Sequence, residues 1–350
     1  MAVVVPRSAQ LGAANPLLRL YCVVGGALVE PDSAVWTVYD VGDDDKLLQP
    51  VLRETGQIEA VTDVLPVGAY TTNWAVPADA PLGRHEVRWE FVVDGMTYEY
   101  REEFDVAPGV VGGAFRSYAL PSDLRAEGAC DGHSEARIQR ALARAAETIN
   151  KVTNRFFEPR ALTLTLDGPG GPALRFGFPV LAVALVAYVG DYAADVPLDR
   201  VRVYNRWLTE GMALPDDRDD PRIAMLPDGY QLPRFNAYPR ELLWRGGRQN
   251  IRVAGLFGYT DPDGSPVGKT PDAIVEVCKV LALRDLPGLY SGADERDAER
   301  ARGRLLSETT RDQSRTYGAD PRLAAAGWTG DPEVDAVLAR YAAPPFVGST

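Results

Sequence analysis

The stretch GRHEVRWEFVVDGMTYEYREEFDV, residues 83–106, decides the fold class of the N-terminal part of this chain. Its first half alternates between two faces of an extended strand, one carrying Val87, Trp89, Phe91 and Val93 and the other Arg88, Glu90 and Val92. The pair Asp94-Gly95 then supplies a two-residue turn of the kind that joins antiparallel strands. The stretch therefore predicts a β-hairpin.

Shorter strand-like stretches precede this hairpin, namely RLYCVVGG, SAVWTVYDV and GAYTTNWAV. Roughly ninety residues of short strands separated by turns, 18–106, predict an Ig-like β-sandwich. The usual Cys-Trp-Cys pattern is missing, so Trp36, Trp74 and Trp89 are core candidates without a disulfide. Residues 1–17 are predicted to form an N-terminal arm.

The period of the sequence changes after residues 107–116, which are predicted to be a linker because 107–113 read APGVVGG. Residues 134–155 repeat apolar side chains at steps of three and four, which predicts a helix that Pro159 stops. The segments ALTLTLDG and ALRF and the apolar stretch 179–189 predict hairpin strands. In the insertion 190–248, VRVYNRW and ELLWRGG are strand candidates on either side of an extended loop.

A strand over 250–260 is followed by two predicted helices, 271–286 and a strongly charged one over 294–316. The tail 320–350 contains one short helix candidate, EVDAVLARY. The predicted fold class is α+β multidomain, in which the N-terminal Ig-like sandwich precedes a helical domain with β-hairpins over 117–319.

Composition narrows the function classes. A formal net charge of −12 argues against a surface that grips DNA or anionic lipid. Cys22, Cys130 and Cys278 lie far apart, so neither a zinc site nor a disulfide framework is indicated, and a reducing intracellular setting fits. The N-terminus does not read as a signal peptide, and 179–189 is too short to span a bilayer. The acidic runs 43–45 and 216–220 are predicted to be solvated loops rather than calcium sites.

One loop imitates a nucleotide-binding motif. Residues 261–270 read DPDGSPVGKT between a strand and a helix, but only three residues separate Gly264 from Gly268 where a phosphate-binding loop needs four. Asp263 stands where a glycine is required, and Pro266 removes a backbone amide. The loop is therefore predicted to be a turn, with Thr270 as N-cap and Pro271 as first residue of a helix.

No catalytic arrangement is predicted. The two histidines, His85 and His133, fall in different predicted domains, His85 on a strand surface and His133 at a helix entry. Paired carboxylates are abundant, as they are by chance in any acidic protein, and a hydrolase is the weaker alternative. We therefore expect a protein that is not an enzyme, with no catalytic residue, cofactor or metal.

The order of segments from residue 117 onward resembles the head–tail connector, or adaptor, family of tailed phages. The resemblance covers about 200 residues and rests on SYALPSDLRAEG, the helix SEARIQRALARAAETINKVTNRFFEPR, the hairpin LTLDGPGGPALRFGFPV, NIRVAGLFGYTDPDG and TPDAIVEVCKVLALRDL. Its most telling positions are Thr153, Arg155, Phe157 and Pro159, then Gly258, Tyr259 and Pro271. The segment PADAPLGRHEVRWEFVVDG also resembles accessory Ig-like domains of phage structural proteins.

The resemblance implies a structural virion protein at the neck, assembled in the host cytoplasm. It implies a homo-oligomeric ring, twelvefold in that family, that docks beneath the portal protein and forms part of the DNA channel. A stopper or tail-completion protein lies below it, double-stranded DNA passes without specific binding, and no membrane is involved. The C-terminal tail is expected to dock the portal through five large side chains, Trp328, Val334, Leu338, Tyr341 and Phe346.

Two other functions remain open at this stage. One is an Ig-like decoration or adhesion protein of the virion neck, in which the N-terminal domain is the active part. The other is a nucleotide-dependent enzyme, which nucleotide binding by the purified chain would favour.

Overall fold

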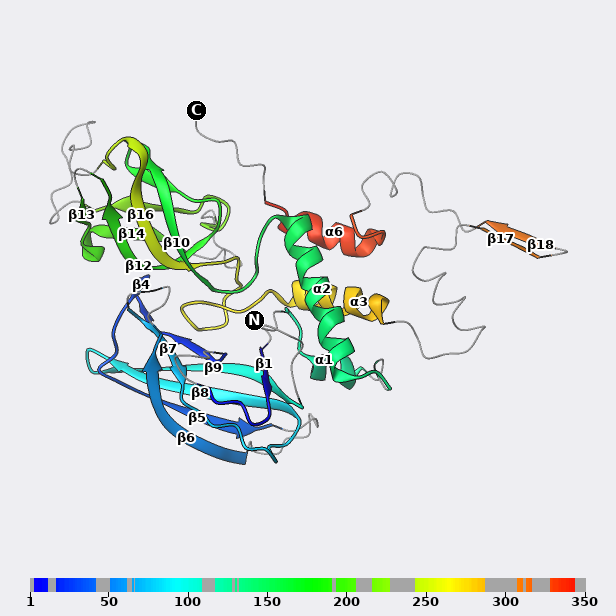
Figure 1. The fold of residues 1–350 in the computed structure, drawn as a ribbon. Helices are drawn as coiled ribbons and strands as arrows, with labels where there is room; N and C mark the ends of the chain where they lie inside the picture. Colours follow the sequence, from blue (N-terminus) through cyan, green and yellow to red (C-terminus); the bar gives the residue numbers. More distant parts are fainter. Residues whose placement is uncertain are drawn as a thin grey trace.

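The computed structural model describes residues 3–11, 17–41, 51–61, 65, 67–108, 117–127, 130, 132–190, 193–205, 216–226, 243–286, 307–310, 313–316 and 328–343. Figure 1 shows the N-terminal sheet below, a second sheet above it, and the helices α1, α2, α3 and α6 beside them. The chain is of mixed α+β class and rich in strands, which confirms the α+β part of the predicted class.

The predicted hairpin over 83–106 is confirmed. Strand β8 (Gly83–Val93) pairs antiparallel with β9 (Met96–Ala107), and Val93 faces Met96 across the turn. Asp94 and Gly95 both have positive φ, 50° and 75°, as a two-residue hairpin turn that follows the strand twist requires.

The N-terminal strands form one curled sheet of seven strands in the order β1-β9-β8-β5-β6-β7-β2. Its other members are β1 (Val3–Pro6), β2 (Arg19–Tyr21), β5 (Ser33–Asp40), β6 (Val51–Ala60) and β7 (Ala69–Thr72). Two separate packed sheets, as expected for the Ig-like sandwich, are not shown. The reason is β6, which pairs with β5 over residues 51–57 and with β7 over 58–60, so hydrogen bonding continues from one layer to the next.

The concave side of this sheet holds an apolar core. Trp36, Trp89 and Phe104 are fully buried there, together with Leu18 and Leu20 from the other end of the sheet. Trp36, Trp74 and Trp89 are thus confirmed as core residues. His85 was wrongly placed on the surface: it shares the inward face of β8 with Val87 and Trp89, is 1% exposed and packs on the ring of Phe104.

The first residues belong to this sheet rather than to a separate arm. Strand β1 pairs parallel with β9, with Val3 facing Phe104. Val3, Val4 and Val5 are buried, so β1 closes one edge of the sheet with apolar side chains.

The second sheet has the order β10-β16-β12-β4-β3, with β13 on the side of β12. Its strands are β3 (Val23–Val24), β4 (Ala27–Leu28), β10 (Arg160–Gly168), β12 (Val180–Tyr188), β13 (Ala194–Asp195) and β16 (Gly247–Phe257). A third sheet has three strands in the order β11 (Ala173–Arg175), β15 (Arg222–Met225) and β14 (Val201–Tyr204). The short 3-10 helix η1 (Leu198–Arg200) precedes β14. The strand candidate ELLWRGG is wrong for residues 243–246, which are irregular and hold Trp244 buried.

The two large sheets share a core. Leu28, Leu65 and Ala69 from the N-terminal part pack with Leu181 and Leu256 of the second sheet. Strand β12 is buried on both faces apart from Leu185, which agrees with its unbroken apolar sequence.

Four helices form the remaining core, α1 (Pro121–Ala126), α2 (Glu135–Thr153), α3 (Asp272–Asp285) and α6 (Pro332–Tyr341). The helices predicted over 134–155, 271–286 and EVDAVLARY are confirmed. The buried rows of α2 and α3 pack against each other and against α6 through a common cluster that includes Ile138, Leu142, Ile149, Ile274, Cys278, Val334 and Leu338.

The helix predicted over 294–316 is wrong for residues 307–310 and 313–316. Strands β17 (Ser307–Thr310) and β18 (Gln313–Thr316) form an antiparallel pair there, and 294–306 lie outside the described residues. Three of the paired positions, Thr309, Thr310 and Thr316, carry β-branched side chains, which favour a strand over a helix.

The N-terminal sheet also contacts the helices. Arg84 forms an ion pair with Asp123, and the backbone N–H of Ser122 donates to Asp105 Oδ2 at 2.8 Å. Most of the predicted linker, 109–116, lies outside the described residues. None of the helices in the described ranges combines the length and hydropathy of a membrane-spanning segment.

Candidate functional site

The residues that carry the family resemblance meet at the joint between the helices and the second sheet. Helix α2 ends at Thr153, and Asn154 then reverses the chain with a left-handed φ of 51°. The following residues lead into β10, while Gly258 and Tyr259 leave β16 beside them. Three elements, α2, β10 and β16, thus meet at this point, which we call the joint.

Aromatic packing forms the centre of the joint. Phe157 is fully buried, and its ring meets three tyrosine rings edge-on, those of Tyr118, Tyr259 and Tyr341, at centroid distances of 5.7, 5.8 and 5.6 Å. Such T-shaped pairs add to the burial of apolar area. One phenylalanine therefore links the residues just before α1, the last residue of α6 and the residues just after β16.

Backbone hydrogen bonds fix the same residue. The Phe157 N–H donates to Tyr118 Oη at 3.1 Å, and the Phe157 carbonyl accepts from Thr270 Oγ1 at 2.8 Å. The Tyr259 N–H donates to the Phe156 carbonyl at 3.0 Å. The predicted N-cap role of Thr270 is not what its side chain does: it binds the joint instead, and no side chain caps α3.

Two arginines lie over the ring of Tyr259. The guanidinium carbons of Arg218 and Arg155 are 4.4 and 4.7 Å from the ring centroid, within the range of cation–π contacts. Burial lowers the pKa of Arg155 and raises that of Tyr259. The joint therefore places positive charge against a partly buried aromatic face.

Carboxylates balance that charge. Arg218 donates to both carboxylate oxygens of Asp216, to Asp261 Oδ1 at 2.6 Å and to the Thr260 carbonyl at 2.8 Å. Burial acts against the Arg218 charge, but these hydrogen bonds outweigh it and raise the pKa. The run 216–220 was predicted to be a solvated loop, which is wrong for its first residues: Asp217 is buried and Asp216 is engaged by Arg218.

The loop 261–270 is closed on itself. Asp261 and Lys269 exchange two backbone hydrogen bonds of 2.8 Å. The N–H groups of Ser265 and Gly268 donate to Asp263 Oδ1 and Ser265 Oγ, and Lys269 Nζ lies 2.7 Å from Asp272. The amides and the lysine that would hold a phosphate are thus used within the loop and by the first residue of α3.

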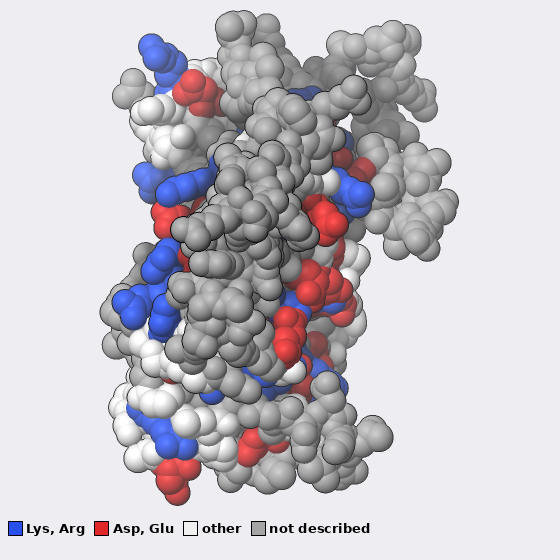
Figure 2. Space-filling view, turned by 90° about the vertical axis from the view of Figure 1, so that its right-hand side faces the viewer, with Lys and Arg blue, Asp and Glu red and all other residues white. Residues whose placement is uncertain are grey.

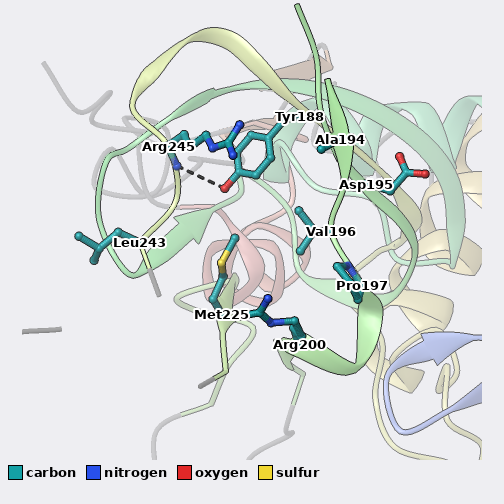
Figure 3. A pocket seen from close by; sticks show the side chains of 9 residues that line it. All are labelled: Tyr188, Ala194, Asp195, Val196, Pro197, Arg200, Met225, Leu243 and Arg245. Carbon is teal, nitrogen blue, oxygen red and sulfur yellow. Dashed lines mark hydrogen bonds between the residues drawn. The ribbon is translucent and has the colours of Figure 1, made fainter. Parts of the chain in front are cut away.

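A separate pocket lies in the insertion, where the sequence predicts strands at VRVYNRW and ELLWRGG on either side of an extended loop. The cavity has a volume of about 410 Å³ and is walled by β12, β13, η1, β15 and the residues before β16. Figure 3 shows the side chains that line it. Val196 and Met225 point toward its centre, whereas the Asp195 carboxylate points away. The guanidinium carbon of Arg245 lies 4.6 Å from the centroid of the Tyr188 ring. The backbone N–H of Arg245 donates to Tyr188 Oη at 3.4 Å.

This pocket has the chemistry of a binding hollow. Its nine described lining residues include Tyr188 and Asp195 but no histidine, cysteine or serine. Arg200 and Arg245 make its polar part cationic. Only the tertiary pairing of β13 with β12 and of β14 with β15 assembles these walls.

Three of the five predicted docking residues, Val334, Leu338 and Tyr341, meet in the helical core. Val334 and Leu338 are buried there against α2 and α3, so their side chains are not exposed on the surface of the single chain. Tyr341 packs on Phe157 and Tyr259, while Trp328 is 50% exposed and Phe346 lies outside the described residues. The helical periodicity of EVDAVLARY was the signal that these side chains share one inward face.

The three cysteines are buried and form no disulfide, and burial raises the pKa of Cys22 to about 12. Among the described residues no group of three His, Cys, Asp or Glu side chains has the arrangement of a metal site. Protein-family models give no match to this chain, and the curated proteins contain none either.

Proposed function

We propose that this chain is the head-to-tail adaptor of a tailed phage, a subunit of a ring that docks beneath the portal and forms part of the DNA channel. The observation that carries the proposal is the joint. Thr153, Arg155, Phe157, Tyr259 and Pro271, by which the chain resembles that family, belong to segments about 110 residues apart and yet lie in or beside one packed cluster.

The role of the joint in this function is mechanical. A ring that passes load between head and tail needs each subunit to behave as one body, and the joint binds the helices rigidly to the second sheet. Ring formation itself follows from burying two different faces of each subunit against its neighbours, a head-to-tail contact that closes when the rotation allows it.

The charge of the chain suits the passage of DNA. A net charge of −12 leaves little tendency to retain a polyanion. Figure 2 shows basic and acidic side chains interspersed on the helical side, with basic groups along its left flank and acidic groups along its right. The proposed partners are a portal protein, a stopper or tail-completion protein and further copies of this chain, at the virion neck after assembly in the host cytoplasm.

The burial of Val334 and Leu338 changes where we place the portal contact. Trp328 is the large apolar side chain of the tail that remains exposed among the described residues. It precedes α6, whose start is fixed by Asp331 accepting hydrogen bonds from the Glu333 and Val334 N–H groups. The portal contact is therefore proposed at Trp328, presented by a helix that is anchored in the core.

The N-terminal sheet is proposed to be an accessory domain of the Ig-like kind. Its strand order, in which β2–β7 and β1–β9–β8–β5 lie at opposite ends of one curled sheet, matches the two layers of such a domain. Side chains from both ends fill one core. In this interpretation β6 changes layers part-way along its length and joins them.

The same observation favours the second candidate, an Ig-like decoration or adhesion protein of the neck. The two functions differ in what the N-terminal domain is needed for. Particles whose chain lacks residues 1–106 are expected to package DNA and join tails if the chain is an adaptor. In the decoration function, such particles would assemble normally but lose attachment to their surface ligand.

The experiment that tests the proposal is localisation of the chain in the particle. A peptide tag at the C-terminus, bound by a gold-labelled antibody, is expected to mark one site at the vertex between head and tail in electron micrographs. Labelling spread over the capsid or along the tail would contradict the adaptor function. Untagged particles are the control for non-specific label.

A further inference from the structure

A second cavity lies at the seam between the N-terminal sheet and the helices. It has a volume of about 280 Å³ and is walled by the start of β8, the end of β9, α1 and the first residue of α2. Most of its wall is apolar, contributed by Leu82, Val106, Ala107, Pro108 and Pro121. A cavity of this size accommodates a short side chain or a small organic molecule.

Two buried polar groups, the Asp105 carboxylate and the Ser122 hydroxyl, face each other at this cavity. Asp105 is 3% exposed, and its Oδ2 accepts from the Ser122 N–H at 2.8 Å, whereas its Oδ1 receives no hydrogen bond from the described part of the chain. The Ser122 hydroxyl, 6% exposed, lies close enough to the Asp105 carboxylate to lower its pKa, and it has no other partner among the described residues. An unsatisfied carboxylate oxygen in such a place is costly unless a donor comes from outside the chain.

The remaining charges of the lining define what that donor is. Arg125 and Glu135 form an ion pair with each other at the cavity, so their charges cancel. The nearby Arg84 is already paired with Asp123 and Glu103. The lining is therefore left with the one negative charge of Asp105 at the base of apolar walls.

We propose that this cavity binds an alkylammonium group, with the ammonium donating to Asp105 Oδ1 and to Ser122 Oγ and the alkyl stem lying against Leu82, Val106 and Pro121. An ammonium carries three donors and no acceptor, which matches two acceptor oxygens and leaves one proton for water. The walls match the apolar stem that lysine and simple aliphatic amines share. An anion would be repelled by the Asp105 carboxylate, and a neutral apolar group would leave Asp105 Oδ1 without a hydrogen-bond donor.

Occupation of the cavity has a consequence for the seam. Asp105 belongs to the N-terminal sheet and Ser122 to α1, so one ammonium held by both joins the two parts of the chain. The site is independent of the proposed function, because any alkylammonium source, a free amine or a lysine of a neighbouring protein, offers the same chemistry.

The test is a titration of the full-length chain, in a buffer free of amines, followed by NMR of the methyl groups of Leu82, Val106 and Ala107. n-Butylammonium is expected to shift these methyl signals saturably, whereas n-butanol and butyrate are not. Asp105→Asn, which keeps the shape of the side chain, is expected to weaken binding by about tenfold or more, the usual effect of losing a hydrogen bond to a charged group. Asp199→Asn, at an exposed position, is the matched control and binds as the wild type does.

Ser122→Ala serves as a second variant if Asp105→Asn disturbs the fold, and it is expected to weaken binding by a smaller factor. N-acetyl-lysine amide against N-acetyl-norleucine amide separates the two sources: binding of the lysine compound supports a lysine side chain as ligand, and binding of butylammonium alone supports a small free amine. Equal effects of butylammonium and butanol, unchanged binding by Asp105→Asn, or no saturable shift would overturn the proposal and leave water as the occupant.

Discussion

At the scale of single residues, close packing at the joint leaves no room for side chains where the chain has glycine. Gly258 lies beside Glu158, and a Cβ built on it would be 2.3 Å from the Glu158 carbonyl oxygen. That atom belongs to the backbone, so it cannot move without shifting the entry to β10. The residue is therefore required by the approach of two chain segments.

Replacing Gly258 by alanine is expected to lower the free energy of unfolding by about 1–3 kcal/mol, the usual cost of overpacking. Chemical denaturation of the two chains measures this directly. Gly171→Ala is the control, because a Cβ there has no neighbour within 4 Å. A loss of stability as large in Gly171→Ala would remove the steric explanation.

Asp105 predicts a dependence of stability on pH. Burial raises its pKa to about 6, against the lowering effect of the Ser122 N–H, while its ordinary value is 3.8. Between these two values the folded chain binds more protons than the unfolded chain, so stability falls as pH rises through this window. The fall amounts to roughly 3 kcal/mol at most.

Asp105→Asn abolishes that contribution. The difference in free energy of unfolding between the variant and the wild type is expected to change between about pH 4 and pH 6 and to be flat above about pH 7. Denaturation curves at a series of pH values supply the difference, and Asp199→Asn should give a flat one throughout. A flat difference for Asp105→Asn would mean that its carboxyl is hydrated in the folded state.

At the scale of elements, α6 shows how a tail segment becomes part of the core. Its buried side chains, Val334 and Leu338, lie one turn apart on the face that meets α2 and α3. Trp328 stands outside this face. Stability and docking are therefore expected to depend on different residues of the same short segment.

Leu338→Ala should lower the free energy of unfolding by about 2–5 kcal/mol, because it leaves a cavity in a closed cluster. Trp328→Ala should change it by less than about 0.5 kcal/mol, as exposed substitutions do. In a pull-down with portal-bearing heads, however, Trp328→Ala is the variant expected to lose attachment while remaining folded. Attachment that survives Trp328→Ala would move the docking surface elsewhere.

At the scale of the whole molecule, the N-terminal sheet is tied to the second sheet as well as to the helices. Its second strand continues into β3 and β4, which belong to the other large sheet, and β4 pairs with β12. Leu28 and Leu65 would be uncovered if residues 1–106 were excised. We nevertheless predict that this part folds independently, at the cost of exposing these apolar side chains.

Two fragments separate these contributions. Residues 18–106 lack β1, whose three buried valines cover the edge strand β9, whereas residues 1–106 keep it. We expect the longer fragment to unfold cooperatively and the shorter one to be less stable by several kcal/mol, since each buried valine contributes about 1.5 kcal/mol or more. Thermal unfolding followed by circular dichroism decides this, and equal stability would show that β1 pairs only in the full chain.

Sequence alone determined the elements whose signals are local. The alternation over 83–93 and the Asp94-Gly95 turn define a hairpin by themselves, because side-chain period and turn geometry act over a few residues. The same holds for α2, whose apolar row is complete within its own 19 residues. The sequence also shows that the G-K-T loop has one residue too few for a phosphate-binding loop. The structure adds that amides of this loop are hydrogen-bonded within the loop itself.

Only the tertiary structure decided which layers those elements join. Whether β6 ends one sheet or continues into the next depends on pairing with β7, and the inward side of α6 depends on α2 and α3 being there. The walls of the pocket in the insertion and of the cavity at the seam come from segments far apart in the chain, so no local sequence pattern predicts either of them. The physical reason is common to all four: burial and hydrogen-bond satisfaction are properties of neighbours in space, which a sequence read locally does not contain.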